Sequence, residues 1–196
     1  MRQRVKAELR KRMRGLRAAL PASACEERSR RIVARLELCE SVARAKSVAL
    51  FWPMLDRHEV DLRPLASRLR AKGVSVALPS TDDEATSMTL RCMSDAALRE
   101  DPLGFQAPGP ECPVATEVDV IVVPAIAVDP RGHRLGYGAG YYDRFLPLVA
   151  PPAVAIAVAF DFQLIAEVPI LAWDVAVSSV VTDARTIECD READSG

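Results

Sequence analysis

The sequence predicts a single three-layer α/β domain, with a Rossmann-like, mostly parallel sheet and helices on both of its faces. Three observations predict it. The chain has 196 residues, 49% of them hydrophobic, which suffices for one sizeable core. Continuous apolar runs, typical of strands buried on both faces, alternate with helical patterns. The sequence also shows no internal repeat and no long linker, so residues 1–196 are expected to form one domain.

The first forty residues predict two basic helices packed on the sheet. Apolar residues recur every three or four positions from Val5 to Leu20, which predicts a helix over about residues 2–20, ended by Pro21. Ser23 is expected to cap a second helix that runs to about Cys39.

The rest of the chain predicts alternating strands and helices. Strands are expected at residues 47–52, 74–78, 86–93, 119–123, 153–160 and 175–181, and helices at 61–72 and 141–148. The stretch from Asp101 to Pro113 holds four of the 14 prolines and is expected to be irregular. The polar tail, residues 188–196, is expected to fray.

Composition excludes several classes of protein. No apolar run approaches the roughly 20 residues that a membrane-spanning helix needs, so no membrane partner is expected. The N-terminal segment lacks the apolar stretch of a secretory signal. Five widely spaced cysteines without a C-x-x-C pair favour reduced thiols in a cytoplasmic protein and argue against a zinc site. Any metal should be a hard cation bound through oxygen.

Positive charge is concentrated at the N-terminus, where residues 1–35 hold 12 Lys or Arg and 3 Asp or Glu. Clustered arginine is typical of phosphate binding, including binding to nucleic acid. No aromatic residue is interleaved with these charges, however, so base stacking is absent and no nucleic-acid partner is expected. The simplest alternative is an amphipathic helix whose apolar stripe packs while charges such as Lys6 and Arg10 stay in solvent.

A glycine-rich loop is the strongest candidate for a ligand site. Four of the nine glycines lie from Gly132 to Gly140, directly before the helix predicted from residue 141. Glycine lets a ligand approach backbone N–H groups, and a helix N-terminus adds unpaired amides. Arg134 could hold phosphate there, and Asp143 could hold Mg²⁺. The G-x-G-x-G spacing matches no standard nucleotide motif, and a tight strand-to-helix connection is the alternative.

The residues around this loop resemble the 5-formyltetrahydrofolate cyclo-ligase family. Residues 122–143, VVPAIAVDPRGHRLGYGAGYYD, are similar to the family's ATP-binding signature, and KAELR at 6–10 is similar to its N-terminal element. The folate-site strand is matched by FWP at 51–53 and EVD at 59–61. The C-terminal segment is matched by VP at 168–169, Asp174 and VVT at 180–182. The resemblance spans nearly the whole chain.

This resemblance implies a monomeric, cytoplasmic enzyme of one-carbon metabolism. It would use ATP and Mg²⁺ to convert 5-formyltetrahydrofolate, with or without additional glutamates, into 5,10-methenyltetrahydrofolate, ADP and phosphate. A formamide oxygen is a poor leaving group, so its phosphorylation would precede attack by N10. A non-catalytic nucleotide- or folate-binding relative is the alternative, favoured by Ala139 where some members carry lysine. A sugar-phosphate enzyme on a similar sheet fits less well, because it should lack the basic N-terminal element.

Matching motif positions also implies a role for each site residue. The implied ATP-binding residues are Lys6, Arg10, Arg134, Leu135, Gly136, Gly138, Gly140, Tyr141 and Tyr142. The implied folate-binding residues are Phe51, Trp52, Glu59, Tyr137 and Tyr141. The implied Mg²⁺ ligands are Asp143 and Asp174, and Arg134 and Tyr141 are implied to act on the reacting groups.

Structural alternatives stand beside these roles. Glu59, near Arg57 in sequence, could be half of a surface ion pair. Trp52 could simply be a core residue, and Asp174 could cap a turn. His133 invites a general-base role, but phosphoryl transfer to a carbonyl oxygen removes no proton from the nucleophile, so we expect none.

Overall fold

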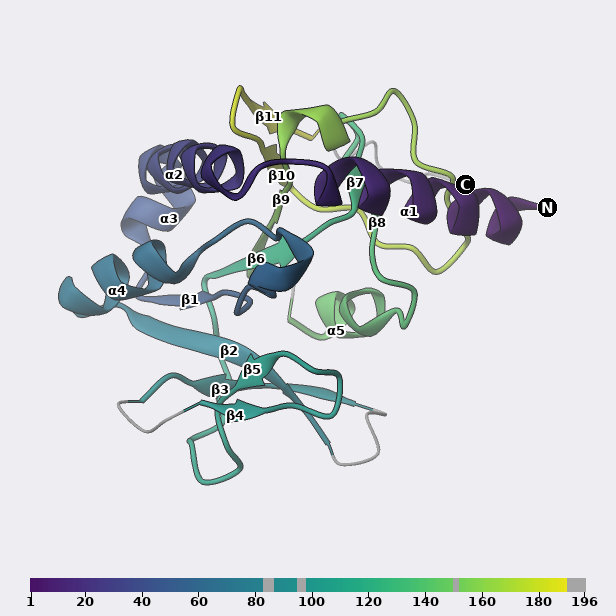
Figure 1. Cartoon of the computed structure of the whole chain (residues 1–196). Coiled ribbons are helices and arrows are strands. Elements are labelled where there is room, and N and C mark those ends of the chain that lie inside the picture. The colour runs from purple at the N-terminus through teal and green to yellow at the C-terminus, as the bar shows by residue number, and fades with distance from the viewer. Residues whose placement is uncertain (83–86, 95–97, 150–151, 190–196) are drawn as a thin grey trace.

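A seven-stranded sheet runs through the centre of the computed structural model, which describes residues 1–82, 87–94, 98–149 and 152–189 (Figure 1). In spatial order its strands are β11 (Thr186–Glu188), β10 (Ser179–Val181), β9 (Val154–Val158), β6 (Val120–Pro124), β1 (Ser47–Ala49), β2 (Ser75–Thr81) and β3 (Met88–Cys92). The five central strands, β10 to β2, are mutually parallel, and the two edge strands are antiparallel to their neighbours. The predicted α/β fold with a mostly parallel sheet is therefore confirmed.

The order of the parallel strands creates a reversal point between β1 and β6. From β1 the chain first adds β2 on one side, and then crosses back to add β6, β9 and β10 on the other. Val48 of β1 consequently lies between Val76 of β2 and Val120 of β6. In open α/β sheets, ligands bind outside the carboxyl ends of the strands at such a reversal. The fold thus points to the loops that follow β1 and β6.

Helices cover both faces of the sheet (Figure 1). One face packs against α2 (Ala22–Leu38), α3 (Glu40–Arg44) and α4 (Arg63–Ala71), and the other packs against α5 (Tyr141–Val149). Successive strand residues point to opposite faces. Val120 and Val122 accordingly belong to the core beneath α2 and α4, whereas Ile121 and Val123 belong to the core beneath α5.

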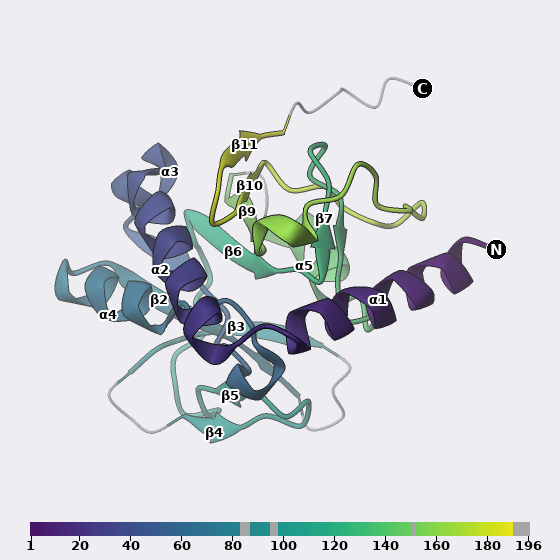
Figure 2. The ribbon, with the colours of Figure 1, turned by 45° about the horizontal axis from the view of Figure 1, so that its top comes forward.

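Helix α1 (Arg2–Ala18) lies apart from α2, beside a small hairpin of β7 (Ala127–Val128) and β8 (Arg134–Leu135) (Figure 2). Met13 packs against this hairpin together with Val168. Val5 and Leu16 are each 47% exposed, whereas Lys6 and Arg17 are each only 5% exposed. The simple expectation of a buried apolar stripe and solvated charges is therefore wrong for much of α1.

Several boundaries differ from the sequence-based expectations. Strand β1 ends at Ala49, so the residues after position 50 leave the sheet. Strand β10 begins only at Ser179. The main chain at Val175 forms hydrogen bonds with the side chains of Arg134 and Asp143 instead of with a neighbouring strand. Helix α2 begins at Ala22 without a side-chain cap, so the proposed capping role of Ser23 is wrong.

The connecting segments contain short elements that sequence patterns did not predict. The expected irregular stretch contributes β5 (Gln106–Ala107), which pairs with β4 (Arg99–Glu100). Two 3-10 turns, η1 (Leu55–Arg57) and η2 (Asp161–Gln163), follow β1 and β9. At the C-terminus, Glu188 pairs with Ser179 rather than fraying. Position 86 of the predicted third strand and the tail from residue 190 lie outside the described residues. None of the described helices has the length and apolar character needed to cross a membrane.

Candidate functional site

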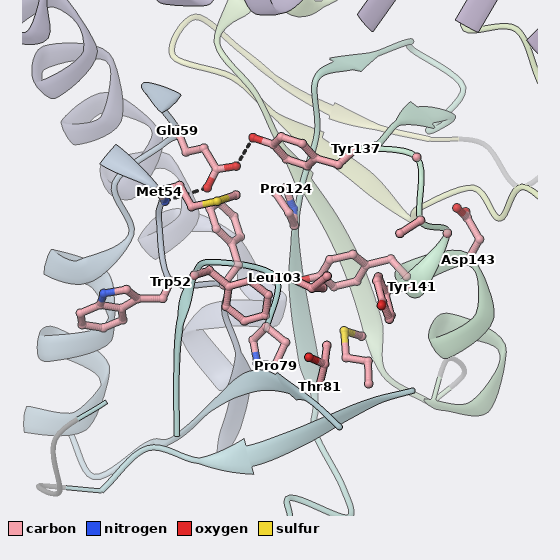
Figure 3. Close-up of a pocket in the computed structure, with 18 of the residues that line it drawn as sticks. Trp52, Met54, Glu59, Pro79, Thr81, Leu103, Pro124, Tyr137, Tyr141 and Asp143 are labelled. Carbon is pink, nitrogen blue, oxygen red and sulfur yellow. Dashed lines mark hydrogen bonds between the residues drawn. The ribbon is translucent and has the colours of Figure 1, made fainter. Parts of the chain in front are cut away.

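An apolar pocket of about 270 Å³ lies at the reversal point of the sheet (Figure 3). Phe51, Trp52 and Met54 border it from the segment after β1, with the Trp52 ring turned away from the other labelled side chains in Figure 3, and Pro124 borders it from the end of β6. The remaining lining comes from η1 and the residues after it, β2, β3, the loop after β4, the glycine-rich region and the start of α5, and comprises Arg57, Glu59, Pro79, Thr81, Met88, Leu103, Phe105, Arg134, Gly136, Tyr137, Gly138, Ala139, Gly140, Tyr141, Tyr142 and Asp143. The early end of β1 therefore has a function, because it frees Phe51 and Trp52 to line this pocket.

A second pocket, polar and about 370 Å³ in volume, lies against α1. Its lining consists of Gln3, Lys6, Arg10, Arg134, Leu135, Gly136, Gly138, Gly140, Asp143, Leu171, Trp173 and Asp174. Arg134, Asp143 and the three glycines of the G-x-G-x-G motif border both pockets. The glycine-rich loop is therefore the shared wall between an apolar and a polar pocket.

The backbone of this loop explains why glycine is present. Gly138 and Gly140 have φ values of 118° and 68°, which side-chain-bearing residues rarely adopt. At Gly136, a Cβ atom would meet no other atom within 4 Å, so a side chain there would extend into open space beside the two pockets. The absence of side chains leaves room for a ligand to reach the loop backbone, as expected for a phosphate cradle.

The basic face of α1 docks onto the segments that carry the expected site residues. Lys6 forms an ion pair with Asp174, and Arg10 Nε donates to Gly136 O at 2.8 Å. At the two ends of this face, Arg2 donates to the carbonyl of residue 170 and Arg17 donates to the Tyr137 hydroxyl, at 3.2 and 2.7 Å. Spacings of four, four and seven residues place these cations on one side of the helix. The basic helix is thus part of the site rather than a solvated surface.

Arg134 and Asp143 form a buried clamp beneath the loop. Arg134 Nη2 donates to Asp143 Oδ1 at 2.8 Å, and Nη1 donates to the Val175 carbonyl. The Val175 N–H donates to the same carboxylate oxygen at 3.2 Å. Burial lowers the pKa of Arg134, and the neighbouring Asp143 carboxylate opposes that shift. In this structure the Arg134 guanidinium holds the loop and Asp143 in place, and Arg134 also borders both pockets.

Glu59 is a buried acidic residue of the apolar pocket. It is only 4% exposed, so its interpretation as half of a surface ion pair is wrong. Its carboxylate accepts the Met54 N–H at 2.9 Å and the Tyr137 hydroxyl, and Figure 3 shows Tyr137 between Glu59 and Asp143 in this view. Burial raises the pKa of Glu59. Burial and the Glu59 charge also raise the pKa of Tyr137 to about 12.

The acidic residues suit a hard cation that shares its ligands with phosphate. Asp143 and Asp174 line the same polar pocket, alongside Lys6 and Arg10. Within the described parts of the chain, no three acidic, histidine or cysteine side chains gather as a protein-only metal site would require. Mg²⁺ commonly takes one or two protein carboxylates and completes its shell with water and phosphate oxygens. The residues present therefore fit Mg²⁺ as a partner of bound phosphates.

The structure brings most of the expected residues together but redistributes some of them. Tyr141 and Tyr142, expected to contact ATP, line the apolar pocket and not the polar one. Leu135 borders the polar pocket as expected. His133, for which no catalytic role was expected, lies outside both linings, with Nδ1 at 3.5 Å from the buried Asp129 carboxylate.

Sequence patterns missed several arginines of the site. The guanidinium carbons of Arg14, Arg17 and Arg57 lie 5.4, 5.8 and 5.9 Å from the centre of the Tyr137 ring. Arg144 lies 5.1 Å from the centre of the Tyr141 ring and donates to the Ala139 carbonyl at 2.8 Å. Arg144 therefore places a cation beside the position where some members of the resembled family carry lysine. Its position four residues after Gly140, in the first turn of α5, was the only available sequence signal.

The fold and the two pockets define an α/β protein in which an apolar pocket and a polar pocket share a glycine-rich loop. A sequence profile of the 5-formyltetrahydrofolate cyclo-ligase family matches residues 2–183. The chain belongs to the 5-formyltetrahydrofolate cyclo-ligase family.

Individual relatives agree with this assignment. The 5-formyltetrahydrofolate cyclo-ligase of Mycolicibacterium smegmatis is 39% identical over 143 residues, which cover 72% of this chain and 69% of the relative. The enzyme of the same name from Escherichia coli is 27% identical over 186 residues, 90% and 99% of the two chains.

Solved structures show the same architecture. The NMR structure of Aquifex aeolicus 5,10-methenyltetrahydrofolate synthetase is similar with a TM-score of 0.82 and 30% identity, covering 98% of this chain and 100% of that one. A 5,10-methenyltetrahydrofolate synthetase from Mycoplasma pneumoniae gives a TM-score of 0.70 at 22% identity, covering 91% and 98%, and supports the fold.

Proposed function

We propose that the protein cyclises 5-formyltetrahydrofolate to 5,10-methenyltetrahydrofolate, using ATP and Mg²⁺ and releasing ADP and phosphate. The observation that carries this proposal is the shared wall between the two pockets. Gly136, Gly138 and Gly140 border both the apolar pocket and the polar one, so ligands in the two pockets would meet at the loop. The names of the relatives supply the substrate, and this geometry supplies a way to bring a phosphoryl donor to it.

The apolar pocket would hold the folate rings. Phe51, Trp52 and Tyr141 offer apolar and aromatic surface, and Glu59 offers a buried acceptor beside Met54 and Tyr137. A few polar groups in an otherwise apolar pocket fix the orientation of a ligand. Glu59 would thus orient the pterin by accepting its N–H groups, while Tyr141, in the first turn of α5, would face the reacting end of the substrate.

The polar pocket would hold the triphosphate. Lys6 and Arg10 supply cations, the loop supplies backbone N–H groups, and Arg134 holds the loop and Asp143 in position. Mg²⁺, held by Asp143 and Asp174, would neutralise charge on the transferred phosphoryl group. The protein's own contribution is to hold the terminal phosphate in line with the formyl oxygen and to exclude water from it.

The reaction then proceeds in two steps. The formyl oxygen attacks the γ-phosphorus, a new P–O bond forms, and the bond to ADP breaks. N10 next attacks the formyl carbon, the C–O bond to phosphate breaks, and the N10 proton leaves to phosphate or water. Phosphate is a better leaving group than the unmodified formyl oxygen. Binding that positions the triphosphate for this transfer therefore makes ring closure possible.

The decisive test supplies 5-formyltetrahydrofolate, ATP and Mg²⁺ together and follows the near-ultraviolet absorbance of the methenyl product and the release of ADP. We expect both to rise in equal amounts and only when all three are present. ATP binding without ADP formation under any folate would instead favour the non-catalytic relative. Ala139, where some members of the family carry lysine, was the argument for the non-catalytic relative. Arg144 places a cation beside this position, which favours an active enzyme. The lining of both pockets comes from one chain, so we also propose that a monomer is the active form. The free cysteines support the proposal that it acts in the cytoplasm.

A further inference from the structure

Trp173 is a large aromatic residue in an unusual place. Its side chain is 63% exposed, yet it lines the polar pocket next to charged residues. A single exposed apolar side chain on an ordinary surface needs no explanation. At the rim of a ligand pocket, however, a flat apolar surface is available to the ligand itself.

The turn that carries Trp173 is held in place. The Asp174 N–H donates to the Leu171 carbonyl at 3.0 Å, and the Leu171 N–H donates back to Asp174 Oδ2 at 2.8 Å. The same Asp174 oxygen forms the ion pair with Lys6. The backbone on both sides of the indole is therefore tied to α1, and the ring is presented from a positioned turn.

The contacts along α1 give the polar pocket two distinct ends. Arg10 donates to Gly136 O at the glycine-rich loop, whereas Arg2 donates to the carbonyl of Ile170, three residues before Trp173. Gln3, which also lines the pocket, lies seven residues before Arg10, a distance of roughly 10 Å along a helix. The loop amides and Arg10 mark the end that suits phosphates. Trp173 and Gln3 therefore mark the opposite end.

We propose that Trp173 is the stacking platform for the base of the bound nucleotide. This inference rests on the proposed function, because it takes the glycine end of the pocket to hold the triphosphate. Once the phosphates lie at that end, the base of the same nucleotide extends toward the indole. Stacking tolerates any base, since every base has a π-face. The site should consequently bind GTP through the same contact, with the Gln3 amide beside the base edge.

The test compares two probes in the absence of folate: Mg²⁺-ATP, which has a base, and Mg²⁺-tripolyphosphate, which has none. Calorimetric affinities are measured for the unmodified chain, Trp173→Ala, Trp173→Phe and the exposed-residue control Leu38→Ala. Removing a stacking aromatic should weaken ATP binding about 5- to 100-fold. Tripolyphosphate affinity should stay within about twofold, Trp173→Phe should retain most ATP affinity, and Leu38→Ala should change neither.

A spectroscopic readout follows the same contact directly. The chain has two tryptophans, and Trp52→Phe leaves Trp173 as the sole reporter. ATP should quench its fluorescence far more than tripolyphosphate does. If Trp173→Ala lost the same affinity for both probes, or lost affinity for neither, the stacking role would be overturned. The proposed function would still stand in that case, provided that ATP binding depends on Lys6. If unmodified chain bound neither probe, both proposals would fail together.

Discussion

Lys6 and Asp174 form an ion pair across 168 positions of the chain, and both side chains are largely buried. The pair joins the first helix to the segment before β10, and both partners face the polar pocket. In the proposed function, Lys6 would exchange some of this contact for nucleotide phosphate, and Asp174 for Mg²⁺. In that case the same two residues would serve both the stability of the fold and the binding of the ligand.

Breaking this pair should cost stability. A buried charge left without its partner is strongly destabilising, so we expect Lys6→Met to lower the free energy of unfolding by about 3 kcal/mol. The double variant Lys6→Met with Asp174→Asn should lose less than the sum of the two single variants, because neither charge is then stranded. Urea unfolding measures these values. Arg44→Met, which removes the exposed pair with Glu40, is the control and should cost less than about 1 kcal/mol. Equal losses in the buried and exposed pairs would contradict the prediction.

Gly136→Ala should separate stability from activity. The added methyl group meets no atom within 4 Å and the backbone there is not among the positive-φ positions, so unfolding free energy should change by less than about 0.5 kcal/mol. The methyl group would nevertheless enter the space beside both pockets, and turnover should fall at least about tenfold. The exposed helical Gly15→Ala is the control and should keep full turnover. Loss of folding together with turnover in Gly136→Ala would show that the loop is structural only.

Asp143→Asn should change the response to Mg²⁺. It removes the charge that faces Arg134 and weakens a carboxylate ligand for a hard cation. We expect a lower maximal turnover and a higher Mg²⁺ concentration for half-maximal rate, measured by titrating Mg²⁺ at fixed ATP. Glu167→Gln, an exposed acid paired with Arg131, is the matched control and should leave the titration unchanged. An unaltered Mg²⁺ titration for Asp143→Asn would remove this residue from the metal site.

Glu59 should make stability depend on pH with a definite sign. Burial raises its pKa, so the folded chain holds this proton more tightly than the unfolded chain. The protonated Glu59 carboxyl therefore contributes stability at low pH. This contribution is lost as the pH rises from the ordinary carboxyl range through the pKa of Glu59 in the folded chain. The unmodified chain should lose stability relative to Glu59→Gln over that interval, by at most about 1.4 kcal/mol per pH unit.

The control for this pH effect has the opposite sign. Hydrogen bonds from the Ser47 and Lys46 N–H groups lower the pKa of Asp119. Its contribution is present above the ordinary carboxyl range and is lost as pH falls through the folded pKa. Urea unfolding should therefore show the unmodified chain losing stability relative to Asp119→Asn as the pH falls below about 4, the ordinary carboxyl range, and not over the higher interval in which Glu59 acts. Parallel pH profiles for Glu59→Gln and the unmodified chain would contradict the assignment.

Arg144 should contribute a cation to the glycine-rich loop. It donates to the Ala139 carbonyl and lies over the Tyr141 ring, but it is exposed, so Arg144→Ala should reduce turnover only about two- to fivefold. Ala139→Lys in the same variant should restore the rate by returning a positive charge to the loop. Initial-rate measurements at low salt provide the readout. A rate that Arg144→Ala leaves unchanged would exclude this electrostatic role.

The central sheet was largely predictable because its strands are continuous apolar runs. The β-branched residues of Val120–Pro124 and Val154–Val158 are compatible with a strand buried on both faces and with little else. The ends of β1 and β10 were not predictable, because the residues beyond them are equally apolar. Phe51 lies outside the sheet because it lines the apolar pocket, and Val175 lies outside it because its carbonyl accepts a hydrogen bond from Arg134. Both partners come from distant parts of the chain.

Motif spacing located the glycine-rich loop but not the environment of its charges. Arg134 was recognisable as a site residue, yet its contacts with Asp143 and Val175 depend on the approach of α5 and the segment before β10. Glu59 shows the same limit. Nothing local distinguishes an exposed carboxylate beside Arg57 from one buried against Tyr137, 78 positions away.

By itself, the sequence determined the class of fold, the position of the glycine-rich loop and the set of residues that chemistry would use, because periodicity and backbone freedom are local properties. Only the tertiary structure decided which face of α1 is buried. Lys6 and Arg17 are covered while Val5 and Leu16 remain half exposed, contrary to what hydropathy alone favours. The physical reason is that a charged group can be buried where distant partners, here Asp174 and Tyr137, compensate for its lost hydration.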